Sequence, residues 1–199
     1  MRAFLSFYKW HIFFIALFVI CVSIFTISSC TKSEPDLVIN VISHGRINVQ
    51  TFDDRKEPLV RLLTHDADGD GEKTLHLASY PFDRQTDMNE AFDILATPND
   101  SDIVITTKET LTSYENKDIF ADMNEFVPEI NSDKYTILKD SSGKVYGVSL
   151  EGNDMLKDMG FFDTSDLYIS VIEDEGEELS PKKKNARNIT IMIIREYNY

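Results

Sequence analysis

The amino-acid sequence predicts a single α/β domain with three layers, preceded by an apolar N-terminal segment that does not join its core. Short β-branched runs, typical of buried strands, alternate along the chain with segments whose apolar residues recur every three or four positions. No internal repeat or long linker divides the chain. The part beyond the apolar segment, about 165 residues, is long enough for one hydrophobic core.

The apolar segment lies at residues 12–27 and contains two hydroxyl residues but no charge. As a helix it would be about 24 Å long, at about 1.5 Å per residue, and its flanks extend it toward bilayer thickness. Arg2 and Lys9 precede it, and such positive charge is typical of the cytoplasmic side of a membrane segment. We therefore expect residues 1–30 to anchor the protein in the cell membrane, with the rest on the extracytoplasmic side.

Residues Ile27-Ser28-Ser29-Cys30 resemble the lipobox of bacterial lipoproteins, in which small residues precede a cysteine that becomes lipidated. Cleavage of this signal peptide would leave Cys30 as the lipid-bearing N-terminus. The alternative is an uncleaved transmembrane helix. In both cases the membrane is a partner, residues 31–35 form a linker and residues 36–199 form the extracytoplasmic domain.

The first elements of the domain are predicted to be a strand, a helix and a second strand. Residues 36–42 form a β-branched run that is too short for a helix, and Gly45 follows it. A proline near the start of residues 57–63, together with apolar residues at helical spacing, predicts a short helix. This helix leads through an Asp-rich loop into a strand at residues 74–78.

The middle of the domain repeats the order helix, then strand. Apolar residues at steps of three and four predict an amphipathic helix at residues 87–96, with Asp87 as its cap. Residues 102–107 are nearly all apolar, the pattern of a strand buried on both faces in a parallel sheet. A short helix at residues 109–114 follows, and the repeated order indicates the α/β class.

The last part of the domain adds a turn, two strands and a closing helix. Residues 119–123 predict a turn into another short helix, and strands are expected at residues 144–150 and 167–172. A charged loop with proline and glycine is expected at residues 173–184, and a helix at residues 185–197. The apolar side of this helix consists of Ala186, Ile189, Ile193 and Ile194.

The Asp-rich loop has the spacing of a calcium loop. Asp66, Asp68 and Asp70 occupy positions 1, 3 and 5, and Gly71 occupies position 6, where the turn is tight. Glu72 at position 7 would offer its backbone carbonyl, but lysine and leucine replace the aliphatic residue and the glutamate expected at positions 8 and 12. A turn without metal uses the same residues, so a weak calcium site and a plain Asp/Gly turn both stay open.

Composition excludes several classes of partner and chemistry. The chain has 34 acidic and 20 basic side chains, and an acidic surface repels the phosphates of nucleic acids, so no nucleic-acid partner is expected. The only cysteines, Cys21 and Cys30, lie in or beside the apolar segment, which leaves the domain without a disulfide, a zinc-binding thiol or a thiol nucleophile.

The histidines and carboxylates form no recognisable catalytic pattern. His44, His65 and His76 lack the paired spacing of a zinc helix, and no Gly-rich phosphate loop is present. We expect His44 to be a turn residue and His76 to face solvent. Most aromatic residues are expected to pack in the core, and no catalytic residue is predicted.

Four stretches resemble bacterial extracellular solute-binding proteins: Ser101 to Ile105 (SDIVI), Tyr114, Phe120 to Phe126 (FADMNEF) and Gly143 to Val148 (GKVYGV). In that family a strand that ends in a ligand-facing loop precedes a short helix. The resemblance covers roughly residues 60–172 and implies one lobe of a periplasmic-binding-protein-like fold, similar to small membrane-anchored relatives. A lone lobe would offer only a shallow ligand site, and no ligand-binding residue is carried over.

The resemblance predicts a membrane-tethered, non-enzymatic binding or interaction module on the extracytoplasmic side, with calcium as the one cofactor the loop suggests. Its partner would be a small solute or a neighbouring membrane protein. Two alternatives stay open. A cell-envelope hydrolase predicts a concave cluster of carboxylates with a raised pKa, and a structural subunit of an envelope complex predicts a contiguous exposed apolar patch.

Overall fold

The structure is a computed structural model. It describes residues 13–23, 34–45, 47–97, 100–127, 129–130, 133–173 and 179–195. The chain divides into two compact units, Met1–Glu34 and Pro35–Tyr199. The boundary falls inside the linker predicted at residues 31–35.

The N-terminal unit contains a helix at residues 13–23, whose side chains are exposed. Within the described part of the chain, no helix has both the length and the apolar character needed to cross a membrane. Both ends of the apolar segment predicted at residues 12–27 lie outside the described residues, as does Cys30. The membrane anchor and the lipidated cysteine therefore stay predictions.

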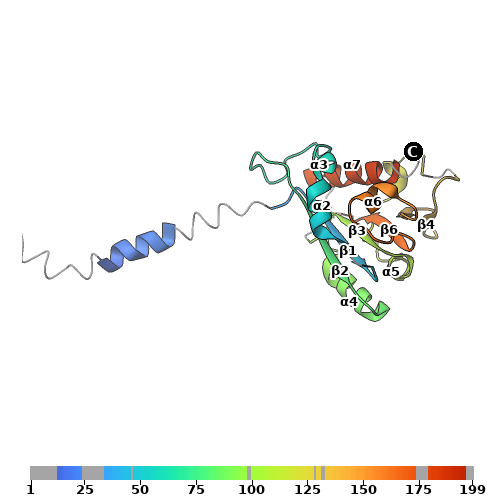
Figure 1. Ribbon diagram of the computed structural model, residues 1–199, viewed down its shortest axis with the longest axis horizontal. Helices are drawn as coiled ribbons and strands as arrows, with labels where there is room; N and C mark the ends of the chain where they lie inside the picture. Colours follow the sequence, from blue (N-terminus) through green and yellow to red (C-terminus); the bar gives the residue numbers. More distant parts are fainter. Residues whose placement is uncertain are drawn as a thin grey trace, which may run out of the picture. The chain divides into compact units, whose positions relative to one another are not determined.

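The second unit is built on a six-stranded mixed sheet with the strand order β2-β1-β3-β6-β5-β4 (Figure 1). Its strands are β1 (Leu37–Ser43), β2 (Leu75–Pro81), β3 (Ile103–Thr107), β4 (Ile137–Lys139), β5 (Val145–Ser149) and β6 (Leu167–Val171). β1 is parallel to both of its neighbours, β2 and β3. The remaining pairs, β3 with β6, β6 with β5 and β5 with β4, are antiparallel.

Helices cover both faces of this sheet. They are α2 (Val49–Arg55), α3 (Glu57–Val60), α4 (Gln85–Leu95), α5 (Lys108–Ser113), α6 (Asp154–Asp158), α7 (Pro181–Arg195) and the 3-10 helix η1 (Met123–Glu125). The buried apolar residues of α2, α3, α6 and α7 belong to one hydrophobic cluster, and those of α4 and α5 belong to a second. Figure 1 shows α2, α3 and α7 on one side of the sheet and α4 on the other.

Each hydrophobic cluster receives side chains from one face of the strands. Ile39 and Val41 of β1 face the first cluster, whereas Ile42 faces the second, because successive strand side chains point to opposite faces. Burial of each such side chain stabilises the fold by about 1.5 to 3 kcal/mol. Every member of both clusters lies between Leu37 and Ile194, and none comes from residues 13–23. The second unit therefore contains a complete core of its own.

The predicted apolar face of the last helix is confirmed. Ala186, Ile189, Ile193 and Ile194 are each at most 1% exposed. The helix begins at Pro181, however, so the loop expected at residues 173–184 was wrong in its last part. Proline is well accepted in the first turn, where its missing N–H has no partner to lose.

Two further expectations are corrected. The helix predicted at residues 87–96 begins at Gln85, so Asp87 lies in its first turn and pairs with Arg84 at 2.9 Å instead of capping the helix. β3 is buried on both faces, as predicted, but it is parallel only to β1 because β6 runs antiparallel on its other side.

Candidate functional site

The strand order reverses between β1 and β3. The chain passes from β1 to β2 on one side and then crosses back to β3 on the other side of β1. The helix after β1, α2, packs on one face of the sheet, and the helix after β3, α5, packs on the opposite face. The two connections therefore separate at the carboxyl ends of β1 and β3, and ligands of open α/β sheets bind at such switch points.

Loops from four parts of the chain meet at this edge, which we call the strand-end edge. Its described residues are 44–45 and 47–48, 82–84, 107–108 and 161–166. The Phe82 N–H donates to the Ser43 carbonyl at 2.9 Å, and His44 Nδ1 lies 3.0 Å from the Phe82 carbonyl oxygen. Ile47 forms an isolated bridge with Phe161, which brings the segment before β6 beside the loop after β1.

The junction of β3 and α5 completes the strand-end edge. The Thr107 hydroxyl oxygen caps α5 by accepting the Thr110 N–H at 3.3 Å, and Thr107 pairs with Leu167 at the start of β6. A hollow of about 500 Å³ opens beside this junction. Its lining residues are Lys108, Glu109, Thr112, Ser113 and Asp166. The hollow combines both signs of charge with hydroxyl groups, which suits a polar ligand.

Phe162 is the aromatic residue that stands out at the strand-end edge. It is 73% exposed, whereas its neighbour Phe161 is 2% exposed. Burial of Tyr114, Tyr146 and Tyr168 confirms the expectation that most aromatic residues pack in the core. An exposed aromatic ring offers apolar contact area to a ligand or a partner.

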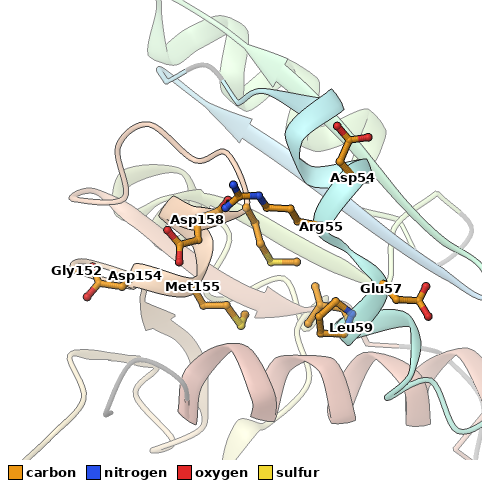
Figure 2. Close-up of a pocket in the computed structure, with 10 residues that line it drawn as sticks. Asp54, Arg55, Glu57, Leu59, Gly152, Asp154, Met155 and Asp158 are labelled. Atoms are coloured by element: carbon orange, nitrogen blue, oxygen red, sulfur yellow. The ribbon is translucent and has the colours of Figure 1, made fainter.

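A deeper cleft of about 630 Å³ lies between α2 and α3 on one side and α6 on the other (Figure 2). Its apolar lining consists of Pro58, Leu59, Met155 and Met159, and its charged lining consists of Asp54, Arg55, Glu57, Asp154 and Asp158. Figure 2 shows Arg55 extending from α2 toward α6, where its Nη1 donates to the Asp158 carbonyl at 2.8 Å. This cleft was not foreseen, because its two walls come from distant segments and neither α2 nor α6 was predicted.

The Asp-rich loop brings together two of its predicted ligands and one residue from outside it. Carboxylate oxygens of Asp36, Asp66 and Asp68 lie within 4.8 Å of one another. Asp36 immediately precedes β1 and is fully buried, and it accepts N–H bonds from Ala67 and, at 2.7 Å, from Thr74. Its participation was not predictable from the spacing within the loop, since it lies 31 residues before Ala67.

Hydrogen bonds within the loop are compatible with both a weak calcium site and a turn without metal. Asp66 accepts N–H bonds from Gly69 at 2.6 Å and Gly71 at 2.8 Å, one on each oxygen. A carboxylate has about four lone-pair sites, so each oxygen keeps capacity for a cation. The same bonds hold the turn without one.

The other two predicted ligands do not join this group. Asp70 Oδ1 accepts the Glu72 N–H at 2.8 Å, which holds the local turn, and both residues are exposed. A cation at the group would therefore be bound by Asp36, Asp66 and Asp68, with Asp70 and Glu72 contributing negative charge nearby.

Asn185 of α7 fixes the start of this loop. Its side chain is fully buried, and its Oδ1 accepts N–H bonds from Thr64 at 2.9 Å and His65 at 3.1 Å. Its Nδ2 donates to the His65 carbonyl at 2.8 Å. The loop position therefore depends on α7, which lies about 120 residues further along the chain.

Among the described residues, the carboxyl groups whose pKa departs clearly from the ordinary value are all shifted downward. His44 lies in a bend and His76 is exposed, as expected. Hydrogen bonds from Arg195, Ser142 and Ser165 lower the pKa values of Glu129, Asp140 and Asp163, respectively. This direction is opposite to the raised pKa that a carboxylic acid needs to act as a general acid near neutral pH.

No protein family, curated protein sequence or solved structure matches this chain.

Proposed function

We propose that the protein is a membrane-tethered, extracytoplasmic binding module that corresponds to one lobe of a solute-binding protein and binds its ligand at the strand-end edge. The ligand is a small polar solute, or a segment of a membrane protein that lies beside it. The proposal treats the domain as non-enzymatic.

The reversal of strand order between β1 and β3 is the observation that carries this proposal. Parallel strands direct their carboxyl ends to one edge, and α2 and α5 pack on opposite faces of the sheet, so the two connections separate there. Ligands of open α/β sheets bind at such a point. The hollow lined by Lys108 and Asp166 and the exposed ring of Phe162 belong to the strand-end edge. Together they offer charge, hydroxyl groups and an apolar surface to one ligand.

The resemblance noted in the sequence supports the same edge. In solute-binding proteins a strand ending in a ligand-facing loop precedes a short helix, and here β3 ends at Thr107 and α5 begins at Lys108 without a gap. A domain held at the membrane would present this edge to solutes or proteins at the same surface.

A melting-temperature screen of residues 35–199 against amino acids, short peptides, sugars and phosphorylated metabolites tests the proposal. A ligand that binds only the folded state raises the melting temperature. We expect one class of solute to do so, and Phe162→Ala to reduce the shift. The matched control is Ile94→Ala, which removes a similarly exposed apolar side chain from α4. Turnover of a solute, or equal shifts in both variants, would contradict the proposal.

A further inference from the structure

We propose that the cleft between α2, α3 and α6 is a second binding site, which takes a small organic cation that carries an apolar body. This site is separate from the strand-end edge and does not depend on the function proposed for that edge. Three properties of the cleft support the assignment: its floor, its charge and its size.

The floor of the cleft is apolar and adaptable. Leu59 is fully buried and Met159 is 4% exposed, so they lie beneath the floor, while Pro58 and Met155 give it its accessible apolar surface. Met155 is partly exposed, and Figure 2 shows it extending from α6 toward Leu59. Methionine side chains are flexible and polarizable, and they fit apolar groups of different shapes. The floor therefore suits an aliphatic chain or a ring.

The rim of the cleft is acidic. Four carboxylates and one guanidinium line it. Two of the carboxylates already have cation partners, since Glu57 pairs with Arg61 at 3.1 Å and Asp154 pairs with Lys157 at 2.8 Å. Among the described residues no lysine or arginine pairs with the Asp158 carboxylate. A ligand cation beside Asp158 would supply that missing partner.

Arg55 bonds the main chain of Asp158 and forms no ion pair with its carboxylate. Its guanidinium Nη1 donates to the main-chain carbonyl of Asp158 and holds α2 to α6. Figure 2 shows Asp54 and Glu57 turned away from α6, whereas Asp154 and Asp158 lie on α6 itself. The cationic end of a ligand is therefore placed at α6, and its apolar body against the methionines.

The size of the cleft fits a small molecule. Sites for small ligands are typically about 300 to 1,000 Å³, lined mainly by apolar groups with a few polar groups that fix orientation. The volume of about 630 Å³ falls inside this range. The acidic excess of the whole chain, with a formal net charge of -14, also disfavours anions.

Methyl NMR of residues 35–199 tests this site directly. With the methionine methyl groups labelled, Met155 and Met159 report on the cleft, while Met88 in the other core cluster is an internal control. The probes are hexylammonium, hexanol and hexanoate at equal ionic strength, which share one chain and differ in charge. We expect Met155 and Met159 to shift saturably with hexylammonium, in the millimolar range typical of a ligand with so few heavy atoms.

The charge preference is tested with matched variants. Asp158→Asn should weaken hexylammonium binding about twofold to fivefold, as expected for an exposed ion pair, and leave hexanol binding unchanged. Glu90→Gln removes one exposed carboxylate from α4, on the opposite face of the sheet, and should change neither.

Three results would overturn the proposal. The first is binding of hexanol or hexanoate as tightly as hexylammonium, and the second is an equal effect of Asp158→Asn and Glu90→Gln. The third is the absence of saturable shifts at Met155 and Met159. None of these results bears on the strand-end edge, which contains no methionine.

Discussion

Asp140 shows how one carboxylate fixes a turn. It precedes the tight turn between β4 and β5, and its Oδ1 accepts the Ser142 hydroxyl at 2.6 Å, the Ser142 N–H at 2.8 Å and the Lys144 N–H at 3.0 Å. These bonds favour the charged carboxylate and therefore lower its pKa below the ordinary value of 3.8. The turn closes at Gly143, whose φ of 92° is in the left-handed region.

This lowered pKa predicts a pH dependence of stability. Because the unfolded state binds the proton more readily, the contribution of Asp140 is fully present above its ordinary pKa and is lost as pH falls through the lower folded pKa. Asp140→Asn should therefore destabilise the domain at neutral pH, and the difference from wild type should shrink toward about pH 3. Urea unfolding at both pH values measures this. Asp83→Asn, which removes an exposed carboxylate outside this turn, is the control. A difference between Asp140→Asn and wild type that does not change with pH would be inconsistent with the prediction.

At the scale of elements, Gly160 joins the end of α6 to the start of α2. Its φ is 101°, its carbonyl accepts the Asn48 N–H at 3.0 Å, and an added Cβ would lie 2.8 Å from the Asn48 carbonyl oxygen. The contact with Asn48 is backbone and cannot give way as a flexible side chain could. The position therefore requires glycine for both conformation and space.

Gly160→Ala should lower the free energy of unfolding by at least about 2 kcal/mol, because left-handed strain and overpacking act together. Gly69→Ala is the matched control, because Gly69 has a φ of 76° but nothing within 4 Å of an added Cβ. It should cost about 1 kcal/mol, from strain alone. Denaturant unfolding compares the two, and equal losses would mean that the close approach of α6 to α2 does not restrict this position.

Calcium binding at the Asp-rich loop should stabilise the domain. Calcium bound at Asp36, Asp66 and Asp68 with a dissociation constant of about 1 mM would raise the unfolding free energy by about 1 kcal/mol at about 5 mM calcium. A domain of this size would then melt about 2 to 4 °C higher. Asp66→Asn should abolish the shift, and Asp83→Asn should preserve it. No shift in the wild type would identify the loop as a metal-free turn.

The sequence predicted elements whose patterns are local and strong. β1, β3 and β6 are short buried runs, and α7 has a regular apolar face. The elements it missed lack such patterns. α2 buries only Phe52 in an otherwise mostly polar segment, and β4 has three residues.

The strand order and the candidate sites depend on contacts that are distant in sequence. Asp36 joins the Asp-rich loop through bonds to Ala67 and Thr74, and Arg55 reaches Asp158 across the cleft. Periodicity and spacing describe neighbours along the chain, so they could not reveal these pairs.

At the scale of the whole molecule, the proposal requires that the N-terminal segment anchor the domain. Mass spectrometry of the mature protein purified from membranes distinguishes the two outcomes that the sequence leaves open. A chain beginning at a diacylated Cys30 indicates lipoprotein processing, and an intact N-terminus indicates a retained helix. Recovery of the protein only from the soluble fraction would contradict the tether.

Amide chemical-shift mapping shows whether the strand-end edge binds the ligand. Residues 35–199 labelled with nitrogen-15 would be titrated with the solute that raises the melting temperature. We expect saturable shifts at His44, at Thr107 to Thr110 and at Phe161 to Leu167, because these segments form the strand-end edge. Saturable binding that leaves all three segments unchanged would contradict the account.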